Sequence, residues 1–296
     1  MSKTTDLTAL NWKLIELDDR EIFEKTGENR DGIAMFGFAS LFFWKEHYRT
    51  SYAVINGNIV CRGLSDKGRC VVYFPRGLNE RVRETIEALI DGCEDKIRLL
   101  PLTRDTAEKI AEAFPDSKIS LLDGKCEYVY SQTDLAELAG KKYHSKRNHI
   151  AKFDRAYGYE YINIDGSNID VLRQCAEHMF NTIENSPEDE YKAIRCAIDN
   201  FAELGLRAGV ITVDGRFAAY SIGSAINENT ADIHFEKADR AFEGSYAKIN
   251  NCFAKYGWPD MEYLNREEDL GIEGLRKAKL SYYPCKMNRM YSVEII

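Results

Sequence analysis

The 296-residue sequence predicts a mixed α/β (α+β) protein built from two tandem copies of one fold. Each copy is expected to hold a mixed, mostly antiparallel sheet flanked by helices. Two hairpins anchor this prediction, one turning at Asn56-Gly57 and the other at Asp214-Gly215, because Asx-Gly between β-rich runs is typical of a tight hairpin. The same order of strands and helices follows each hairpin, at an offset of about 160 residues, which indicates an internal duplication.

In the first copy, an apolar run predicts a buried helix at 33–48, ahead of the hairpin at 52–61. Alternating strands and helices follow at 70–74, 80–90, 97–100, 105–114, 119–122 and 127–130. Asn79 is expected to cap the first of these helices, and Pro101 is expected to end the strand after it. The longest apolar run, 32–44, is shorter than the roughly 20 residues that span a bilayer, so we expect no transmembrane segment.

The second copy repeats this order with a hairpin at 210–220, followed by strands and helices at 231–237, 246–256, 261–264, 272–282 and 287–296. We therefore divide the chain into three parts. Residues 1–140 form an N-terminal domain, 141–166 a bridging basic helix and linker, and 167–296 a C-terminal domain.

Composition limits the function and the compartment. A net charge of −8 excludes a general nucleic-acid binder, so no DNA partner is expected. Eight scattered cysteines show no CxxC pair, and the N-terminus is polar and of mixed charge. We expect a reduced, cytoplasmic protein with buried thiols, including Cys93, and no signal peptide.

The segment 141–155 carries six Lys or Arg and one acid. On a helix, its apolar residues would share one side and its basic residues another. Lys146, Arg147 and Lys152 are the candidate phosphate contacts, since guanidinium and ammonium groups both bind phosphate. The alternative is a solvated basic face with no ligand.

The strand 231–237 alternates strictly, so Asp232, His234 and Glu236 are expected on one face. His234 or Glu236 would then serve as general base toward an acceptor amine or hydroxyl. The alternative is a polar strand face paired with its neighbours.

Polar residues also gather where the next strand ends. Asn265, Glu267 and Asp269 would bind an ammonium group, although Asp269 could instead cap the following helix. Arg276 and Lys279, one turn apart, would contact a phosphate or form a solvated helix face.

Several site types are not predicted. His144 and His149 are five residues apart, which misses the spacing for a shared metal on a helix, so we expect no metal. The sequence shows no P-loop, dinucleotide fingerprint or Gly-x-Ser-x-Gly elbow, and no covalent nucleophile stands out. Acyl transfer would proceed by direct attack of the acceptor.

The order of elements resembles the GNAT acyltransferase fold, in which a helix N-terminus binds an anionic group. The acetyl-CoA loop of that family has two residues between its Arg or Gln and its Gly, whereas three separate Arg240 from Gly244 here. Three stretches (140–153, 234–238 with Gly244-Ser-Tyr246, and 264–282) resemble the catalytic C-terminal domain of bacterial phosphatidylglycerol lysyltransferases. That domain is a tandem GNAT fold related to the aminoacyltransferases of peptidoglycan cross-bridges.

The resemblance implies transfer of an aminoacyl group from aminoacyl-tRNA to a hydroxyl or amine acceptor, with no cofactor beyond the donor. It makes the second copy the catalytic half, with His234, Glu236 and Asp269 as catalytic residues and Tyr246 among the substrate contacts. Full-length lysyltransferases carry a multi-span membrane region before this domain, and it is missing here. A bacterial stand-alone member is therefore expected, and its acceptor stays open among a small molecule, a lipid and a peptide. The alternatives are an acyl-CoA-dependent N-acyltransferase and a non-catalytic module that binds tRNA or a protein.

Overall fold

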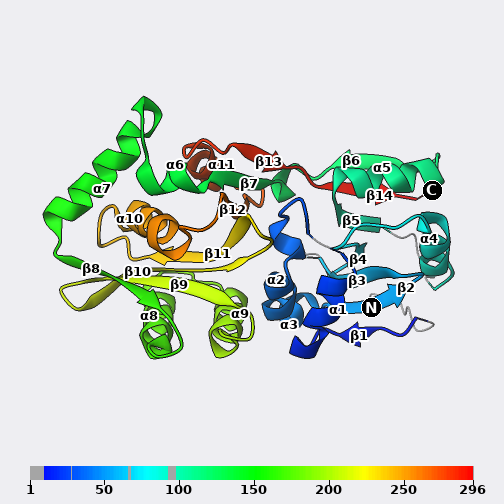
Figure 1. The fold of residues 1–296 in the computed structure, drawn as a ribbon, viewed down its shortest axis with the longest axis horizontal. Helices are drawn as coiled ribbons and strands as arrows, with labels where there is room; N and C mark the ends of the chain where they lie inside the picture. Colours follow the sequence, from blue (N-terminus) through cyan, green and yellow to red (C-terminus); the bar gives the residue numbers. More distant parts are fainter. Residues whose placement is uncertain (1–9, 28, 66–67, 93–97, 296) are drawn as a thin grey trace. The chain divides into compact units, whose positions relative to one another are not determined.

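The computed structural model describes residues 10–27, 29–65, 68–92 and 98–295. They form two compact units, each drawn from several stretches of the chain (Figure 1). The first unit comprises the described part of Met1–Glu127 together with Glu268–Glu273 and Met287–Ile296, and the second comprises Tyr128–Glu267 and Gly274–Lys286. The expected linker, 141–166, therefore lies inside the second unit.

One seven-stranded sheet has the order β1-β2-β3-β4-β5-β14-β6. Its strands are β1 (Lys13–Leu14), β2 (Ser51–Ile55), β3 (Asn58–Leu64), β4 (Cys70–Tyr73), β5 (Arg98–Leu102), β6 (Lys118–Leu121) and β14 (Tyr291–Glu294). The α-helices of this unit are α1 (Arg20–Lys25), α2 (Phe38–Phe43), α3 (Lys45–Tyr48), α4 (Val82–Asp91) and α5 (Arg104–Ala113).

The other seven-stranded sheet has the order β13-β7-β12-β11-β10-β9-β8. Its strands are β7 (Glu127–Ser131), β8 (Tyr159–Ile164), β9 (Leu206–Val213), β10 (Arg216–Ala225), β11 (Thr230–Ala238), β12 (Tyr263–Glu268) and β13 (Lys286–Asn288). Its helices are α6 (Gln132–Glu137), α7 (His144–Ala156), α8 (Ile169–Thr182), α9 (Glu188–Asp199), α10 (Ser245–Cys252) and α11 (Glu273–Leu280). Helices α8 and α9 cover one face of this sheet and α10 covers the other (Figure 1).

The two sheets share one strand order once corresponding strands are matched, which agrees with the predicted duplication. In each, antiparallel strands lead to a parallel pair, β4–β5 or β11–β12, joined through a helix. Strand β14 lies between β5 and β6, whereas its counterpart β7 lies between β12 and β13. The last strand of each copy thus completes the sheet of the other copy, which explains why neither unit is a continuous piece of chain.

Both predicted hairpins are confirmed. Asn56 and Gly57 have φ of 52° and 81°, and Asp214 and Gly215 have φ of 48° and 75°. Two successive residues with positive φ are what a tight type I′ turn requires, and Asn, Asp and Gly adopt that conformation at least cost.

Other expected elements differ in their limits. The helix expected at 33–48 is divided into a 3₁₀ turn (Ala34–Phe36), α2 and α3: Gly37, with an extended conformation, separates the turn from α2, and Trp44 lies between α2 and α3. Asn79 does not cap α4; its side chain accepts a hydrogen bond from the backbone of Arg81, and the helix begins at Val82. Strand β5 continues through Pro101 to Leu102, and the expected C-terminal strand is divided into β13 and β14.

The second unit has apolar cores that hold its helices on the sheet. Tyr143 and Phe153, at the two ends of the segment containing α7, are fully buried, as the amphipathic pattern predicts. Fully burying side chains of this size contributes about 1.5–3 kcal/mol each. Trp258 and Phe253 fill the core between the sheet and α6.

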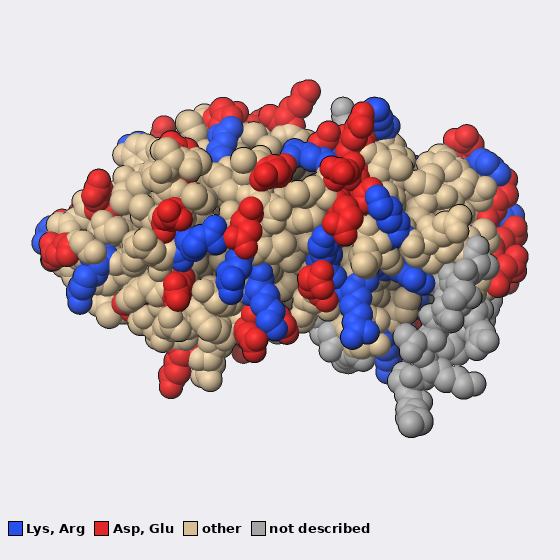
Figure 2. Space-filling model, turned by 90° about the horizontal axis from the view of Figure 1, so that it is seen from below, with Lys and Arg blue, Asp and Glu red and all other residues tan. Residues whose placement is uncertain are grey.

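The surface and the thiols match parts of the sequence expectation. No helix in the described residues is long and apolar enough to cross a membrane. Cys61, Cys126, Cys175 and Cys252 are buried free thiols, and Cys93 lies outside the described residues. Acidic and basic side chains are interspersed on the face shown in Figure 2, so that face has no single-sign field to attract a polyanion.

Candidate active site

The parallel strands β11 and β12 separate part-way along their length. They pair only from Thr230 to Asp232 of β11, opposite Tyr263 to Asn265 of β12, yet both strands continue beyond the paired stretch. Where neighbouring strands part, their backbone N–H and C=O groups no longer bond to each other, and side chains of both strands can face the gap. Of the polar residues predicted from the sequence, Asp232 and Asn265 form the last pair, and His234, Glu236 and Glu267 lie beyond it, where the strands diverge.

A β-bulge occurs on β11 at His234. On the neighbouring strand β10, Gly223 pairs with Ile233 and Ile222 pairs with Phe235, so His234 is an extra residue. A bulge shifts the alternation of every later side chain by one position. The prediction that Asp232, His234 and Glu236 share one face is therefore wrong.

Asp232 and His234 lie on the face that α8 and α9 cover. Asp232 pairs with Ser224 of β10. Ser224 and Tyr220 lie on the same face of β10, and Tyr220 lines the pocket beside α8 and α9. Ile233, between them, packs on the opposite side with Trp258. The bulge thus keeps Asp232 and His234 together and moves Glu236 away.

The residues around His234 form a buried polar cluster, hereafter the His234 cluster: Asp232, His234, Glu267 and Ser224. His234 Nε2 lies 2.8 Å from Ser224 Oγ. Its Nδ1 lies 3.0 Å from Asp232 Oδ2 and 3.8 Å from Glu267 Oε1. The side chains of Asp232 and His234 are 0% and 1% exposed, whereas that of Glu267 is 31% exposed and is the member that solvent reaches.

Charge within this cluster controls the His234 ring. Burial lowers the pKa of His234, but the Asp232 carboxylate and then Glu267 outweigh burial and raise the pKa to about 9. The cluster thus favours a positive charge between its two carboxylates. A neutral general base, as the sequence suggested for His234, does not fit this electrostatic setting.

Backbone geometry positions Glu267. This residue has a φ of +57°, an uncommon conformation for a side chain of its size. The side-chain oxygen of Asn265 accepts a hydrogen bond from the Glu267 N–H at 2.9 Å, which holds the turn. Asn265 is fully buried, so it positions Glu267 instead of binding an ammonium group itself.

On the other face, Glu236 is held by Arg266. The Glu236 carboxylate accepts a hydrogen bond from Arg266 Nη2 at 2.8 Å, and the side chains are 12% and 15% exposed. Asn250 of α10 lies against both groups. A carboxylate already neutralised by a buried guanidinium is poorly suited to take a proton.

Lys146 of α7 reaches the same face. Its ammonium group lies 3.8 Å from the centre of the Tyr282 ring and donates to Ser281 Oγ at 2.7 Å. Burial, and then the nearby Arg266, lower the pKa of Lys146 to about 8. Lys279 also donates to the backbone oxygen of Arg266, so Lys146, Glu236 and Lys279 are each linked to Arg266.

Comparison with known proteins decides the family. The model of the phosphatidylglycerol lysyltransferase C-terminal family matches residues 32–294, most of the chain. The chain belongs to this family. It is also 31% identical to a conserved protein of unknown function from Bacteroides thetaiotaomicron, with a TM-score of 0.85 over 97% of this chain and 100% of that one.

More distant structures agree in fold. L-PGS from Bacillus licheniformis is 15% identical, with a TM-score of 0.61 over 95% of this chain and 93% of that one. A tandem GNAT protein from the clavulanic acid biosynthesis pathway is 12% identical, with a TM-score of 0.51 over 97% and 99%. These likenesses confirm the tandem GNAT-like fold. An uncharacterized Mycoplasmoides gallisepticum protein is 23% identical over 181 residues, and the match spans 58% of its length.

The two other basic residues expected to contact phosphate, Arg147 and Lys152, each bind a different part of the protein. Arg147 donates hydrogen bonds to the backbone oxygens of Leu138 and Gly140. Lys152 pairs with Glu243 at 2.6 Å, with both side chains more than half exposed. Together with Lys146, these residues point to three different partners, so they do not form one phosphate site.

The remaining expected residues lie on different elements. Asp269 lies in the first unit, where its carboxylate accepts a hydrogen bond from Gly271 N–H at 2.7 Å in the turn before α11. Tyr246 is 39% exposed in the first turn of α10, and Arg276 is half-buried on α11. Sequence reasoning missed Ser224, which belongs to no motif, and Arg266, which lies within 264–282 but is recognisable only through its partner Glu236.

Helix α7 packs closely on the start of α10. Gly244, just before α10, has a φ of +93°, and a Cβ there would lie 2.8 Å from the backbone oxygen of His149. This turn matches the one that holds an anionic group in the GNAT fold. In this chain the backbone carbonyl oxygen of His149 faces the turn.

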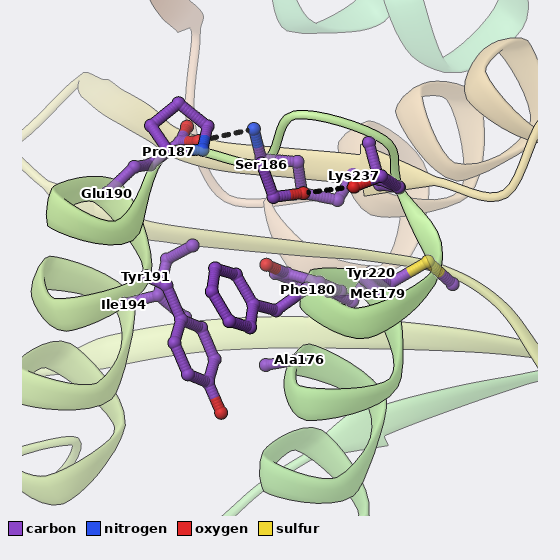
Figure 3. Close-up of a pocket in the computed structure, with 11 residues that line it drawn as sticks. Ala176, Met179, Phe180, Ser186, Pro187, Glu190, Tyr191, Ile194, Tyr220 and Lys237 are labelled. Carbon is purple, nitrogen blue, oxygen red and sulfur yellow. Dashed lines mark hydrogen bonds and ion pairs between the residues drawn. The ribbon is translucent and has the colours of Figure 1, made fainter.

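A separate pocket lies between α8, α9 and the sheet (Figure 3). The empty space between its lining residues, with open solvent included, is about 230 Å³. Phe180 and Tyr191 stack in it with ring centres 4.1 Å apart, and Lys237 pairs with Glu190 at 2.6 Å. None of the site residues expected from the sequence lines this pocket.

Proposed function

We propose that this protein transfers an aminoacyl group from an aminoacyl-tRNA to a hydroxyl or amine acceptor, at the place where β11 and β12 separate. The observation that carries the proposal is the His234 cluster on the diverging part of these strands, in a chain of an aminoacyltransferase family. Buried groups of opposite charge beside a strand opening are typical of catalytic sites.

The reaction needs what such a cluster can supply. The acceptor oxygen or nitrogen attacks the ester carbonyl carbon, and the bond from that carbon to the ribose oxygen breaks. The carbonyl oxygen gains negative charge in the transition state, and the acceptor proton ends on the ribose oxygen. The positive centre of the His234 cluster stabilises the oxyanion, and Glu267, the exposed member, relays the proton.

The donor's phosphates would lie on the face of Lys146 and Lys279. Lys146 projects from α7, in which Arg155 is also exposed, and the exposed Lys141 lies in the 3₁₀ turn just before that helix. These charges are local, in a chain with a net charge of −8. They favour a single acceptor-stem end over extended nucleic-acid binding.

The turn at Gly244 supports aminoacyl-tRNA over acyl-CoA. A diphosphate bound there would meet the backbone oxygen of His149 instead of free N–H donors. Oxygen facing phosphate is repulsive, whereas a helix N-terminus binds phosphate through unpaired N–H groups.

Calorimetry and a transfer assay test the proposal. The full chain is titrated with a non-hydrolysable aminoacyl-tRNA analogue and with acetyl-CoA, and binding of the tRNA analogue alone is expected. Transfer is then followed with radiolabelled aminoacyl-tRNAs and pools of lipid, peptide and small-molecule acceptors. Glu267→Gln should lower transfer at least about 100-fold, while Glu268→Gln, one residue away and paired with Lys125 at 3.0 Å, should not. Binding of acetyl-CoA alone would refute the proposal, and tRNA binding without transfer would favour a non-catalytic module.

A further inference from the structure

We propose that Asp232, His234 and Glu267 bind one divalent transition-metal ion, of the class of Zn²⁺, Mn²⁺ or Fe²⁺. One nitrogen and two carboxylate oxygens from these side chains lie within 4.8 Å of one another. The sequence predicted no metal, because no cysteine pair has the close spacing of a zinc site and His144 and His149 miss the helical spacing of a shared metal. These three ligands come from two strands, and Glu267 is 33 positions beyond His234 in the sequence.

The distances suit a shared ion. Two ligand atoms each about 2.1 Å from an ion lie about 3.0 Å apart at a right angle and about 3.4 Å apart at a tetrahedral angle. His234 Nδ1 lies 3.0 Å from Asp232 Oδ2 and 3.8 Å from Glu267 Oε1. Small rotations of the partly exposed Glu267 side chain bring all three into range.

Asp232 supplies independent evidence. Its carboxylate is completely buried, and neither oxygen accepts a hydrogen bond of normal geometry from the described residues. His234 Nδ1 lies 3.0 Å from Oδ2, and this contact is an ion pair only when the ring is protonated. A buried carboxylate without donors is costly, whereas buried carboxylates that coordinate metals are common. When the ring is neutral, an ion between Asp232 and His234 gives the carboxylate a positive partner.

The orientation of His234 also fits a metal ligand. A histidine that binds a metal through one nitrogen usually donates its other N–H to a nearby oxygen. Ser224 Oγ occupies that position, 2.8 Å from Nε2. With the proton on Nε2, the Nδ1 lone pair points toward the two carboxylates. The bulge at His234 and the left-handed backbone at Glu267 both direct side chains to this point.

The ligand set indicates the kind of ion. Calcium and magnesium prefer sites made of oxygen only, whereas imidazole with carboxylates suits zinc, manganese and iron. Three protein ligands leave at least one position open for another oxygen. If the proposed aminoacyl transfer is correct, that position takes the ester carbonyl oxygen or the acceptor hydroxyl, and the ion is the positive centre of the His234 cluster.

Metal binding is tested without any donor or acceptor. The full-length chain is stripped with a chelator, dialysed, and titrated with Zn²⁺, Mn²⁺ and Mg²⁺ by calorimetry, with bound metal counted by mass spectrometry. We expect one Zn²⁺ or Mn²⁺ per chain and much weaker binding of Mg²⁺. Asp232→Asn and Glu267→Gln should each weaken binding more than 100-fold, and Ser224→Ala should weaken it about 10-fold. Glu268→Gln on the same strand should bind as the parent does.

Two controls keep the outcome decisive. Circular dichroism shows whether Asp232→Asn folds; if it does not, Glu267→Gln, at a partly exposed position, gives the answer alone. A Co²⁺ spectrum without a thiolate band excludes binding at the exposed Cys285. A parent chain that binds neither Zn²⁺ nor Mn²⁺, or variants that bind them as tightly as the parent, would overturn the site. A chain that binds the ion but transfers no aminoacyl group would refute the proposed function and leave the metal site standing.

Discussion

His234 and Glu236 are two residues apart on β11, yet their side chains lie on opposite faces of the sheet. The bulge at His234 causes this, because Ile222 of β10 pairs with Phe235 while Gly223 pairs with Ile233. The inserted residue thus places the polar side chains of one strand in two separate sites, one on each face of the sheet. His234 joins two carboxylates, and Glu236 joins Arg266. The two sites therefore respond differently to substitution.

We expect the main effect of replacing Glu236 to be a lower free energy of unfolding. Glu236→Gln removes the negative charge opposite Arg266, a guanidinium 15% exposed beside the Tyr282 ring. Breaking a buried ion pair by removing one partner costs about 3–5 kcal/mol, so the free energy of unfolding in urea should fall by an amount of this order. Glu236→Gln combined with Arg266→Met should recover part of the loss, because no unpaired charge then remains.

The matched control for that experiment is an exposed pair in the same unit. Glu243→Gln breaks the Lys152–Glu243 pair, in which both side chains are more than half exposed. Exposed pairs contribute little, so the free energy of unfolding should change by no more than about 1 kcal/mol. An equal loss in both variants would contradict the buried character of the Glu236–Arg266 pair.

Lys146 should make stability depend on alkaline pH. Burial and Arg266 lower its pKa in the folded protein to about 8, below the 10.5 that is usual for lysine. Between these two values the unfolded chain binds more protons than the folded one, so the free energy of unfolding should rise as pH increases from about 8 to 10.5. Below pH 8 both states carry the charge, and the folded state bears the full cost of burying it.

Urea unfolding at several pH values from 7 to 10 measures this effect. Lys146→Met should be more stable than the parent at pH 7, and its advantage should shrink as pH rises. Lys152→Met, on the exposed side of the same helix, should show no such trend. If Lys146→Met and the parent differ by a constant amount across this range, the lowered pKa of Lys146 is refuted.

The sequence predicted the fold through local turn chemistry. Asn56-Gly57 and Asp214-Gly215 located both hairpins, and the repeated order of elements led to the tandem architecture. It could not reveal that β7 and β14 exchange sheets, because strand pairing depends on long-range contacts that leave no local pattern. Helices α8 and α9 were not assigned at all, although each has a buried apolar side.

The candidate site was predictable only in part. His234 and Glu267 were both singled out, but on separate grounds, since nothing in the sequence states that two strands bring them together. The bulge was invisible because strict alternation of polar and apolar residues is what a regular strand also shows. Lys146, Arg147 and Lys152 looked equivalent on one helix, and only their partners distinguish a half-buried amine, a carbonyl-binding guanidinium and a surface pair.

A side chain at Gly244 should destabilise the protein. Its φ is +93°, and a Cβ would lie 2.8 Å from the backbone oxygen of His149 and 3.2 Å from Phe153 Cβ. Gly244→Ala must therefore move α7 away from α10, in addition to the conformational strain. Gly215→Ala is the control, because Gly215 also has a positive φ, +75°, but open space around it.

We expect Gly215→Ala to cost about 1 kcal/mol, the usual penalty of a positive φ, and Gly244→Ala to cost about 2–4 kcal/mol. Thermal unfolding compares the two. Equal losses would show that α7 and α10 are not in the close contact described here. If the proposed donor site is correct, Gly244→Ala should also weaken binding of the aminoacyl-tRNA analogue, since Lys146 moves with α7.

Removing β14 should damage the sheet to which it contributes and spare the other. A chain ending after Met290 lacks the strand that lies between β5 and β6, where Tyr291 pairs with Leu102 and with Leu121. Backbone groups of β5 and β6 then lose their partners, and Val293, fully buried, no longer fills the core. Hydrogen exchange of amides in β5 and β6 should speed up by orders of magnitude, while amides of β9, β10 and β11 keep their protection. Uniform loss of protection in both sheets would instead show that the two units unfold as one.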